Sequence, residues 1–475
     1  MKQYAFIIKN GFLVDPANDR KGIYDIAVDQ DGFIAEIGKT ITANALEIID
    51  AEGLIVAPGI IDCHMHASSA YGGPLAHRML AKAGVVTAVD LGGPIDDTLS
   101  IAHDYGCGLN MAFLQTVKPG ETIRNTNPQR DEIEKLLDNT LNAGGIGFKV
   151  LGGHFPLTPE GTETVFTTAH EHGAYMAFHA GTLATGSNLD GLKEAAELAS
   201  GKRLHLAHIN SYCRGNILPA EEEAEEALRI LEQNPNIQSE SYLARINGLS
   251  GRCTGGKPES TGTQAALAIR GYEQSTQGMR DAIKDGWCQV NAPIGGTIIQ
   301  LDAQSGLEFW EERHQLKQSV AVSFAINPPA TRIRLASAKG KNGAFIINAI
   351  STDGGGIPRN DQVEKGLALV RAEVFNIQEY IHKVSTAPAQ MLGLSNKGHL
   401  AEGADADISI LCLNTLQPKM TLGKGRIIMQ DGVIHGHGTT VLTTDKGQQQ
   451  LRAKGFNKIQ TTDLSEKPFL RTLSD

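Results

Sequence analysis

The chain is poor in cysteine and in positive charge, and each shortage excludes a class of protein. Its six cysteines are scattered over 475 residues without a Cys-x-x-Cys pair, which is typical of reduced thiols in a cytoplasmic protein and not of a disulfide framework. Lysine and arginine number 43 against 53 acidic residues, a net charge of −10. Neither nucleic acid nor an anionic membrane is therefore an electrostatically favoured partner.

Long apolar runs and nucleotide-binding motifs are also missing. No apolar run approaches the ~18–20 residues that a membrane span needs. The first apolar stretch is short, is interrupted at Asn10-Gly11 and lacks a small-residue cleavage site, so we expect no signal peptide. Gly144-Gly145 and the other glycine clusters lack the spacing of a P-loop or a dinucleotide-binding turn, so we expect no nucleotide cofactor.

Glycine and apolar residues, in contrast, are plentiful. Glycine accounts for 53 of the 475 residues, and 41% of the chain is apolar. This composition favours a large core with many turns and excludes a coiled coil or a disordered chain.

Between residues 58 and 398, apolar strand-like runs alternate with helical stretches, the pattern of parallel β-α-β units. The runs are IIDCHMH, GVVTAVD, LNMAFLQ, GIGFKVL, AYMAFHA, RLHLAHI, NIQSESYL and AFIINAISTD, with helices expected at 129–143, 160–172, 189–200 and 220–234. Eight such strands favour an α/β fold of the TIM (β/α)8 barrel type over an open sheet. The glycine-rich stretch at about 244–345 breaks the alternation, and we interpret it as an insertion before the last strand.

Both ends of the chain instead contain short strands joined by tight turns. Asn10-Gly11, Asp31-Gly32 and Asp431-Gly432 are two-residue hairpin signals. The strands of the two ends must pair with each other to bury their apolar faces, so we expect one discontinuous β-sandwich domain of residues 1–57 and 399–440. Residues 441–475 are expected to form a polar C-terminal tail that docks or is partly disordered.

Residues able to bind a metal ion stand at the ends of several predicted barrel strands. His64 and His66 are two apart on a strand, so their imidazoles point to the same face and can hold one cation. A single His-x-His is weak evidence, but His179, His208 and Asp353 also end strands, at the edge where barrel enzymes build their sites. A structural role for any one of these residues remains open, whereas the set favours a metal centre.

A lysine lies within the apolar run GIGFKVL. Burying Lys149 as an ammonium ion is costly unless its end reaches solvent, and a lysine that snorkels in this way is the structural alternative. The functional hypothesis is that CO2 carboxylates Lys149. The resulting carbamate turns a costly buried cation into an anion that bridges two metal ions.

The segments PGIIDCHMH, FKV, FHA, HLAHIN and STD resemble the amidohydrolase superfamily. Among its branches they are most similar to the hydantoinase, dihydropyrimidinase, dihydroorotase and allantoinase group, with the N-acyl-D-amino-acid deacylases close behind. The closing KGHLAEGADADISIL is also typical of the superfamily, and the resemblance covers about residues 5–435.

This resemblance implies a binuclear site and two divalent metal ions, with zinc expected and manganese or iron left open. The implied ligands are His64, His66 and Asp353 for one metal, His179 and His208 for the other, and carboxylated Lys149 between them. His205 competes with His208, but it points the other way across its strand. In such a site the metals activate a bridging hydroxide that attacks the substrate carbonyl, and Asp353 carries the proton to the leaving nitrogen.

Two further residues have implied roles at the substrate. Hydantoinase-like sequences have an oxyanion-binding tyrosine five residues after the bridging lysine, where this chain has His154. An imidazole can donate the same hydrogen bond, and a loop histidine without this role is the alternative. Asn327, which precedes two prolines, resembles the residue that hydrogen-bonds the substrate amide, although it is also compatible with a simple turn.

The chain departs from the family pattern after Asp353. Gly354-Gly355-Gly356 follows, where the cyclic-amide hydrolases usually have histidine, and we expect these glycines to leave room for a bulkier substrate or for backbone N–H groups to approach it. Arginines 245, 252 and 359 lie on predicted loops at the barrel mouth. Any of them can bind a substrate carboxylate, and the sequence does not distinguish them.

The resulting hypothesis is a cytoplasmic, metal-dependent hydrolase that cleaves a C–N amide bond of a small cyclic amide or ureide. The alternatives are an N-acyl-D-amino-acid deacylase acting on a linear amide, a deaminase, which Lys149 argues against, and a non-catalytic dihydropyrimidinase-like binding protein. We also expect a homo-oligomer, a dimer or a tetramer, because of the family resemblance and the polar C-terminal tail.

Overall fold

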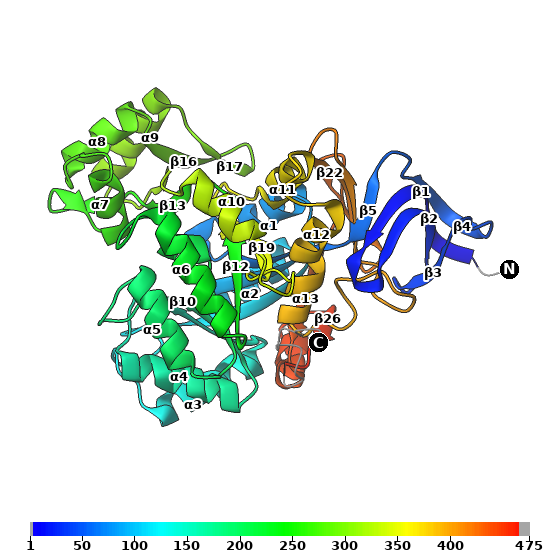
Figure 1. Cartoon of the computed structure of the whole chain (residues 1–475), viewed down its shortest axis with the longest axis horizontal. Helices are drawn as coiled ribbons and strands as arrows, with labels where there is room; N and C mark the ends of the chain where they lie inside the picture. Colours follow the sequence, from blue (N-terminus) through cyan, green and yellow to red (C-terminus); the bar gives the residue numbers. More distant parts are fainter. Residues whose placement is uncertain (1–2, 465–475) are drawn as a thin grey trace.

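The computed structural model describes residues 3–464 of the chain. A central barrel separates two smaller units, a β-rich unit made by the chain ends and an inserted unit on the opposite side (Figure 1). Within residues 3–464, no helix combines the length and the apolar character of a membrane-crossing segment.

The barrel wall is a parallel sheet whose strands follow one another in sequence order. The strands are β6 (Ile60–His66), β7 (Val85–Gly93), β8 (Cys107–Val117), β9 (Gly147–Leu151), β10 (Tyr175–His179), β11 (Leu204–Leu206), β12 (Ile237–Tyr242) and β19 (Ala349–Ser351). Only two residues separate β19 from β20 (Gly354–Gly355), which pairs in parallel with β6. Because β19 pairs with β12 on its other side, the chain itself closes the barrel, and the predicted (β/α)8 architecture is confirmed.

Helices on the outside of the barrel connect the strands. They are α1 (Pro74–Lys82), α2 (Ile95–Tyr105), α3 (Arg130–Ala143), α4 (Pro159–Glu171), α5 (Leu189–Ala199), α6 (Ala220–Gln233), α10 (Pro329–Ser337) and α11 (Gln362–Arg371). Phe148, Phe178 and Leu206 from the strands pack with apolar residues of α3 to α6 in one buried cluster. A separate cluster joins residues from β6, β8, β10 and β19, so side chains fill the barrel interior.

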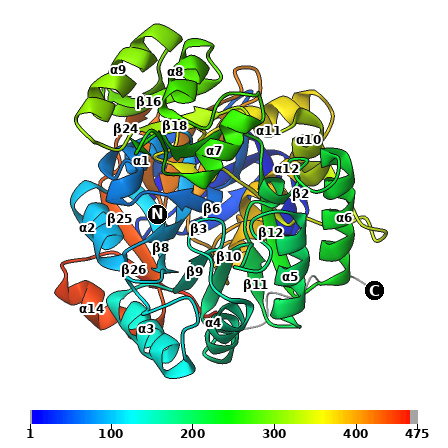
Figure 2. The same ribbon diagram turned by 90° about the vertical axis from the view of Figure 1, so that its left-hand side faces the viewer.

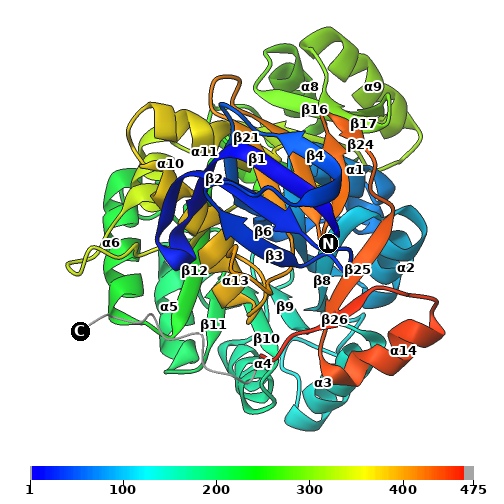
Figure 3. The ribbon, with the colours of Figure 1, turned by 90° about the vertical axis from the view of Figure 1, so that its right-hand side faces the viewer.

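The β-rich unit combines strands from both ends of the chain in one sheet. In the described residues its strands are β1 (Gln3–Asp15), β2 (Arg20–Val28), β3 (Ile34–Gly38), β4 (Asn44–Asp50), β5 (Ile55–Pro58), β21 (Ile408–Cys412), β22 (Gln417–Gly423), β23 (Arg426–Gln430) and β24 (Val433–Ile434). The two ends meet where β5 runs antiparallel to β21, with Val56 opposite Ile410. Figure 3 looks onto this unit, with the barrel behind it.

The described part of the C-terminal tail docks on the barrel, which is one of the two alternatives expected for residues 441–475. β25 (Gly438–Thr443) pairs in parallel with β8 and also with β26 (Ile459–Thr461). Between them, α14 (Gln448–Ala453) buries Leu451 in a cluster with residues of α2 and β8. Apolar side chains in a polar-looking segment explain the docking, and residues 465–475 lie outside the described part.

The insertion extends from β13 to β18 and is shorter than the predicted stretch of about 244–345. It contains β13 (Asn247–Ser250), β14 (Cys253–Thr254), β15 (Lys257–Pro258), α7 (Thr261–Ala268), α8 (Thr276–Lys284), β16 (Cys288–Ile294), β17 (Thr297–Gln300), α9 (Ala303–Gln315) and β18 (Ala321–Phe324). Trp287, Trp310 and Phe324 belong to its own buried core. Its helices α7, α8 and α9 lie together on one side of the molecule (Figure 2). Pro329 opens α10, where its fixed φ suits the first turn of a helix, and α10 packs against the barrel helix α6.

A buried lysine joins the β-rich unit to the barrel. Lys397 Nζ lies 2.8 Å from Asp405 Oδ2 and 2.7 Å from Asp407 Oδ2, and all three side chains are at most 4% exposed. Asn110 of β8 donates a hydrogen bond to Asp407 over 2.8 Å. Removing one charge from such a group leaves an uncompensated ion in the interior.

We therefore expect Lys397→Met to lower the free energy of unfolding by about 3–5 kcal/mol, measured by urea unfolding. Lys419→Met is the matched control, because Lys419 pairs with Asp431 at 3.3 Å on the exposed surface. The control should change stability by less than about 1 kcal/mol. Equal effects of the two substitutions would contradict a structural role for the buried group.

Candidate metal centre

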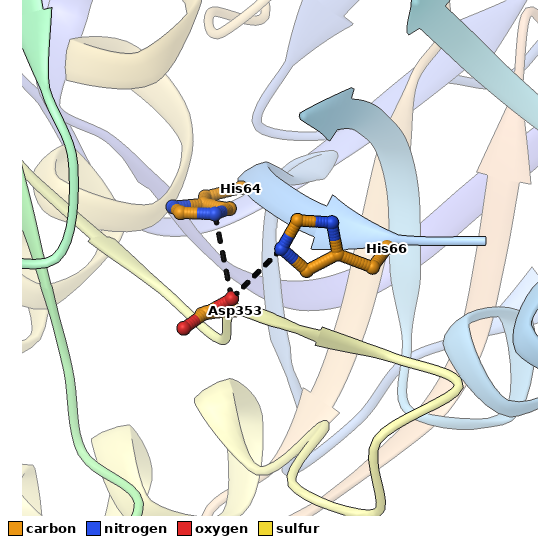
Figure 4. Close-up of side chains that lie close together, drawn as sticks. All are labelled: His64, His66 and Asp353. Atoms are coloured by element: carbon orange, nitrogen blue, oxygen red, sulfur yellow. Dashed lines mark ion pairs between the residues drawn. The ribbon is translucent and has the colours of Figure 1, made fainter. Parts of the chain in front are cut away.

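Side chains from the first and last barrel strands meet at one point. His64 Nε2 lies 3.4 Å and His66 Nε2 3.0 Å from Oδ1 of Asp353. One potential ligand atom from each residue lies within 4.8 Å of the other two, and all three residues are buried (Figure 4). Asp353 stands between β19 and β20 with a left-handed backbone, φ 48°. Two imidazoles and a carboxylate around a common point are a donor set that suits zinc.

Glu240 of β12 orients His64 through the ring nitrogen that does not face Asp353. Its Oε1 lies 2.6 Å from His64 Nδ1 and accepts the backbone N–H of His208 over 2.7 Å. Its Oε2 accepts the hydroxyl of Ser351 over 2.6 Å. Because the carboxylate accepts hydrogen bonds, the proton of His64 is expected on Nδ1, which leaves Nε2 to face Asp353 with its lone pair.

The local electrostatics keep His64 neutral. Burial and the Lys149 charge lower the pKa of His64 to about 4, although Asp353 and Glu240 oppose the shift. A neutral imidazole is the form that binds a metal ion.

Two further histidines extend the cluster. The ring of His208 stacks on that of His64 with centroids 5.0 Å apart, and the His179 ring lies 4.4 Å from His208. His208 follows β11 with a φ of 34°, and its buried Nδ1 has no hydrogen-bond partner in the described structure. His205 instead lies 2.9 Å from the hydroxyl of Tyr175 through its Nδ1, with its ring 6.5 Å from that of His64.

Lys149 lies in the middle of β9 and is fully buried. Among the described residues, its Nζ has no hydrogen-bond partner. Burial lowers the pKa of Lys149 to about 8, although the carboxylates of Glu240 and Asp353 favour the charged form. The side chain therefore does not snorkel to solvent, and an amine without a partner stands next to the histidine cluster.

Two glycines bring the loop after β9 close to His179. A Cβ on Gly153 would lie 2.2 Å from His179 Nε2, and one on Gly152 would lie 2.0 Å from the carbonyl oxygen of Gly181. Only glycine permits this approach. The loop places the ring of His154 5.5 Å from that of His179, so the predicted oxyanion donor lies beside the cluster. His179 Nε2 pairs with the hydroxyl of Ser187 at 2.7 Å.

Three arginines were equivalent candidates in the sequence, and Arg359 is the one that is bound to Asp353. Its Nη2 forms an ion pair with Asp353 Oδ2, and its Nε donates to the Asp353 carbonyl oxygen over 2.7 Å. Burial raises the pKa of Asp353, but Arg359 and the histidines outweigh it and hold this pKa well below its ordinary value. Arg245 is exposed, and Arg252 pairs with Glu259 at 3.3 Å on the surface.

The amide of Asn327 is fully used within the protein. Its Oδ1 accepts from Arg214 Nε over 3.0 Å and from the Tyr242 hydroxyl over 3.1 Å. Its Nδ2 donates to the carbonyl oxygens of Ala244 and Ile246 over 3.2 and 3.1 Å. An amide has two donors and two acceptor positions, so Asn327 has none left over for a substrate in this arrangement.

The expectation that Gly354-Gly355-Gly356 leaves room for a substrate was wrong. A Cβ on Gly355 would lie 2.1 Å from the carbonyl oxygen of His66, and one on Gly356 would lie 1.6 Å from that of Tyr71. Gly355 also pairs with His66 in the parallel ladder of β20 and β6. Backbone that closes the barrel therefore fills the space that the missing side chains leave.

Sequence reasoning missed Glu240 and Arg214. Glu240 lies in the run NIQSESYL and could have been found by the signal that identified Lys149. That signal is a charged residue within a strand that the barrel buries. Arg214 has no comparable signal, because it follows β11 in an irregular segment and acquires its contacts only through the fold.

Known proteins place these features in a family. The model of the amidohydrolase family matches residues 55–245 and 261–437, well over half of the chain. Dihydroorotase from Lactococcus lactis is 32% identical over 165 residues, 33% of this chain and 37% of that protein, so the match spans little more than a third of the relative. Dihydroorotase from Pelobacter propionicus is 22% identical over 439 residues, which cover 85% of this chain and 89% of the relative.

Solved structures agree on the fold. N-acyl-D-glutamate deacylase from Bordetella bronchiseptica, complexed with zinc and a phosphonate inhibitor that mimics the tetrahedral intermediate, matches with a TM-score of 0.65. The sequences are 16% identical, and the match covers 93% of this chain and 99% of the deacylase. The family match over the barrel and part of the β-rich unit shows that the chain belongs to the amidohydrolase family.

Proposed function

We propose that the protein is a metal-dependent hydrolase that cleaves a C–N bond of a small amide, with a cyclic amide or ureide as the first candidate substrate. The convergence of His64, His66 and Asp353, next to a buried amine, supports this proposal most directly. A group of neutral imidazoles and an ionised carboxylate is unfavourable in an apolar core, but it is a suitable set of ligands for a divalent cation.

The donor groups fit two divalent ions, zinc first. We assign His64, His66 and Asp353 to one ion, His179 and His208 to the other, and Lys149 to the position between them. Buried nitrogens of His64, His208 and Lys149 that have no hydrogen-bond partner in the described part of the chain support this assignment. Bound metals in such a site acidify water and polarise the substrate carbonyl.

The bridging role of Lys149 requires carboxylation of its amine. Only the neutral amine reacts with CO2, and a pKa of about 8 makes that form accessible near neutral pH. The nitrogen bonds to the carbon of CO2 and loses one proton to solvent. The product is an anionic carbamate with two oxygen ligands in place of a buried cation.

Asp353 and His154 perform the proton and oxyanion chemistry in this proposal. Arg359 holds Oδ2 of Asp353 and keeps the carboxylate ionised, so Oδ1 accepts the proton from the attacking water and delivers it to the leaving nitrogen. His154, beside His179, donates a hydrogen bond to the oxygen of the tetrahedral intermediate.

A linear-amide deacylase is the second candidate. Its support is the similarity of fold to N-acyl-D-glutamate deacylase, together with a histidine where hydantoinase-like sequences have tyrosine. Hydrolysis assays of the zinc-loaded protein with hydantoins, dihydropyrimidines and N-acyl amino acids test both candidates. Failure to cleave any amide would contradict the proposed function.

Substitutions of Asp353 and His154 should separate their roles. We expect Asp353→Asn to lower kcat by about 10³-fold or more per bound metal, because proton acceptance and leaving-group protonation fail together. His154→Ala should lower kcat by about 10²–10³-fold with KM nearly unchanged. Steady-state kinetics with metal content measured on the same samples check both. A raised KM with normal kcat would make His154 a substrate-binding residue.

Glu240 should matter for metal affinity. Residues that orient a metal-binding histidine typically contribute about 10–100-fold in affinity. We expect Glu240→Gln to weaken zinc binding within this range, and Glu240→Ala to weaken it further, in competition with a chromogenic chelator. Glu259→Gln, which alters a surface carboxylate paired with Arg252, is the control and should leave the affinity unchanged. Normal affinity in both folded Glu240 variants would refute its role.

A further inference from the structure

Arg214 lies near the candidate metal centre, and the side chains to which it is hydrogen-bonded are all neutral. Its Nε donates to Asn327 Oδ1 over 3.0 Å, and its Nη2 lies 2.9 Å from the hydroxyl of Tyr242 and 3.3 Å from that of Ser211. In the described part of the chain, no carboxylate lies within 4 Å of this guanidinium, and its Nη1 has no hydrogen-bond partner. The side chain is half-buried, so the positive charge is only partly exposed to water.

The neighbouring Arg359 shows the contrast. Its guanidinium lies over the ring of Tyr242, 4.9 Å from the centroid, and its charge is neutralised by the ion pair with Asp353. Tyr242 therefore has one neutralised arginine over its face and one without a counter-charge at its hydroxyl. Excess positive charge beside a ligand site attracts an anionic ligand.

The surroundings hold Arg214 in place. Asn327 is itself fixed by its hydrogen bonds to two carbonyl oxygens. Asn210 of the short helix η3 (Ile209–Tyr212) exchanges two hydrogen bonds with the backbone of Tyr242, over 2.9 and 3.2 Å. A long side chain that neutral groups orient in this way has already lost much of its conformational freedom, which favours binding through its remaining donor.

The position relative to the metal ligands fits contact with a substrate. The ring of Tyr242 lies 6.4 Å from that of His208, and Arg214 contacts the hydroxyl end of the same tyrosine. Tyr242 therefore contacts Arg214 through its hydroxyl and has its ring close to that of His208, so one side chain connects the guanidinium with the histidine cluster.

We propose that Arg214 binds a carboxylate carried by the substrate. The substrate class is then an amide, cyclic or linear, with an anionic carboxylate near the scissile bond. Asn327, Tyr242 and Ser211 act as positioning residues that hold the guanidinium. This proposal rests on the proposed amide hydrolysis, because the bound anion is a substrate only if the protein is a hydrolase. The anion site itself does not require catalysis.

Binding of two amides that differ only in a free carboxylate, measured on the zinc-loaded full-length protein, tests the anion site. The probes are N-acetylglycine and its methyl ester, compared by calorimetry for wild type, Arg214→Gln, Arg214→Lys and the control Arg252→Gln. We expect wild type and the control to prefer the acid. Arg214→Gln should lose about 10–100-fold in affinity for the acid alone, since a hydrogen bond to a charged group has this magnitude. Arg214→Lys should retain part of the preference, because it keeps the charge without the planar fork.

Equal binding of acid and ester by wild type, absence of binding for both, or an Arg214→Gln variant no weaker than Arg252→Gln would each overturn the proposal. Kinetics separate it from the proposed function. If acidic and neutral amides are hydrolysed equally and independently of Arg214, the carboxylate site is wrong and amide hydrolysis stands. If no amide is cleaved while acid binding still depends on Arg214, the hydrolase proposal is wrong and the anion site stands.

Discussion

The site depends on one buried carboxylate, Glu240. It contacts the imidazole of His64 on β6, the backbone after β11 at His208 and the hydroxyl of Ser351 on β19. The fully buried anion thereby links three other parts of the barrel wall at the end where the histidines gather. Burial raises the pKa of Glu240, but the hydrogen bond with His64 and the nearby ring of His205 hold it well below the ordinary value. Because hydrogen bonds compensate the buried charge, the carboxylate orients the histidines without an unpaired ion in the interior.

The sequence was sufficient for the fold and for most of the cluster, for a simple geometric reason. Parallel strands of a closed barrel end at the same edge, so residues that terminate separate apolar runs meet there. His64, His179, His208 and Asp353 all stand at such ends, and the structure places their side chains near one another. Their metal-binding roles stay predictions, as does the homo-oligomer.

Features that depend on distant contacts were not predictable in the same way. The sequence suggested open space at Gly355 and Gly356, because it does not show that the backbone of His66 and Tyr71 lies against them. Arg359 was one of three equivalent arginines until the fold brought it onto Asp353. The segment after residue 440 looked polar, yet Leu451 anchors it to the barrel.

Two arginines near the candidate metal centre differ in the groups that hold them. Arg359 uses its charge to fix Asp353, whereas Arg214 is oriented by neutral groups. Under the proposal that Arg214 binds a substrate carboxylate, the amide of Asn327 acts by holding this arginine in position.

The count of metal ions per chain tests the central claim most directly. Protein produced with ample zinc and bicarbonate, freed of loosely bound metal and analysed by mass spectrometry of its elements, should contain two divalent ions per chain, and Lys149→Ala should contain fewer. Wild-type protein with one ion or none, or an unchanged count after loss of the lysine, would contradict a binuclear centre bridged by Lys149.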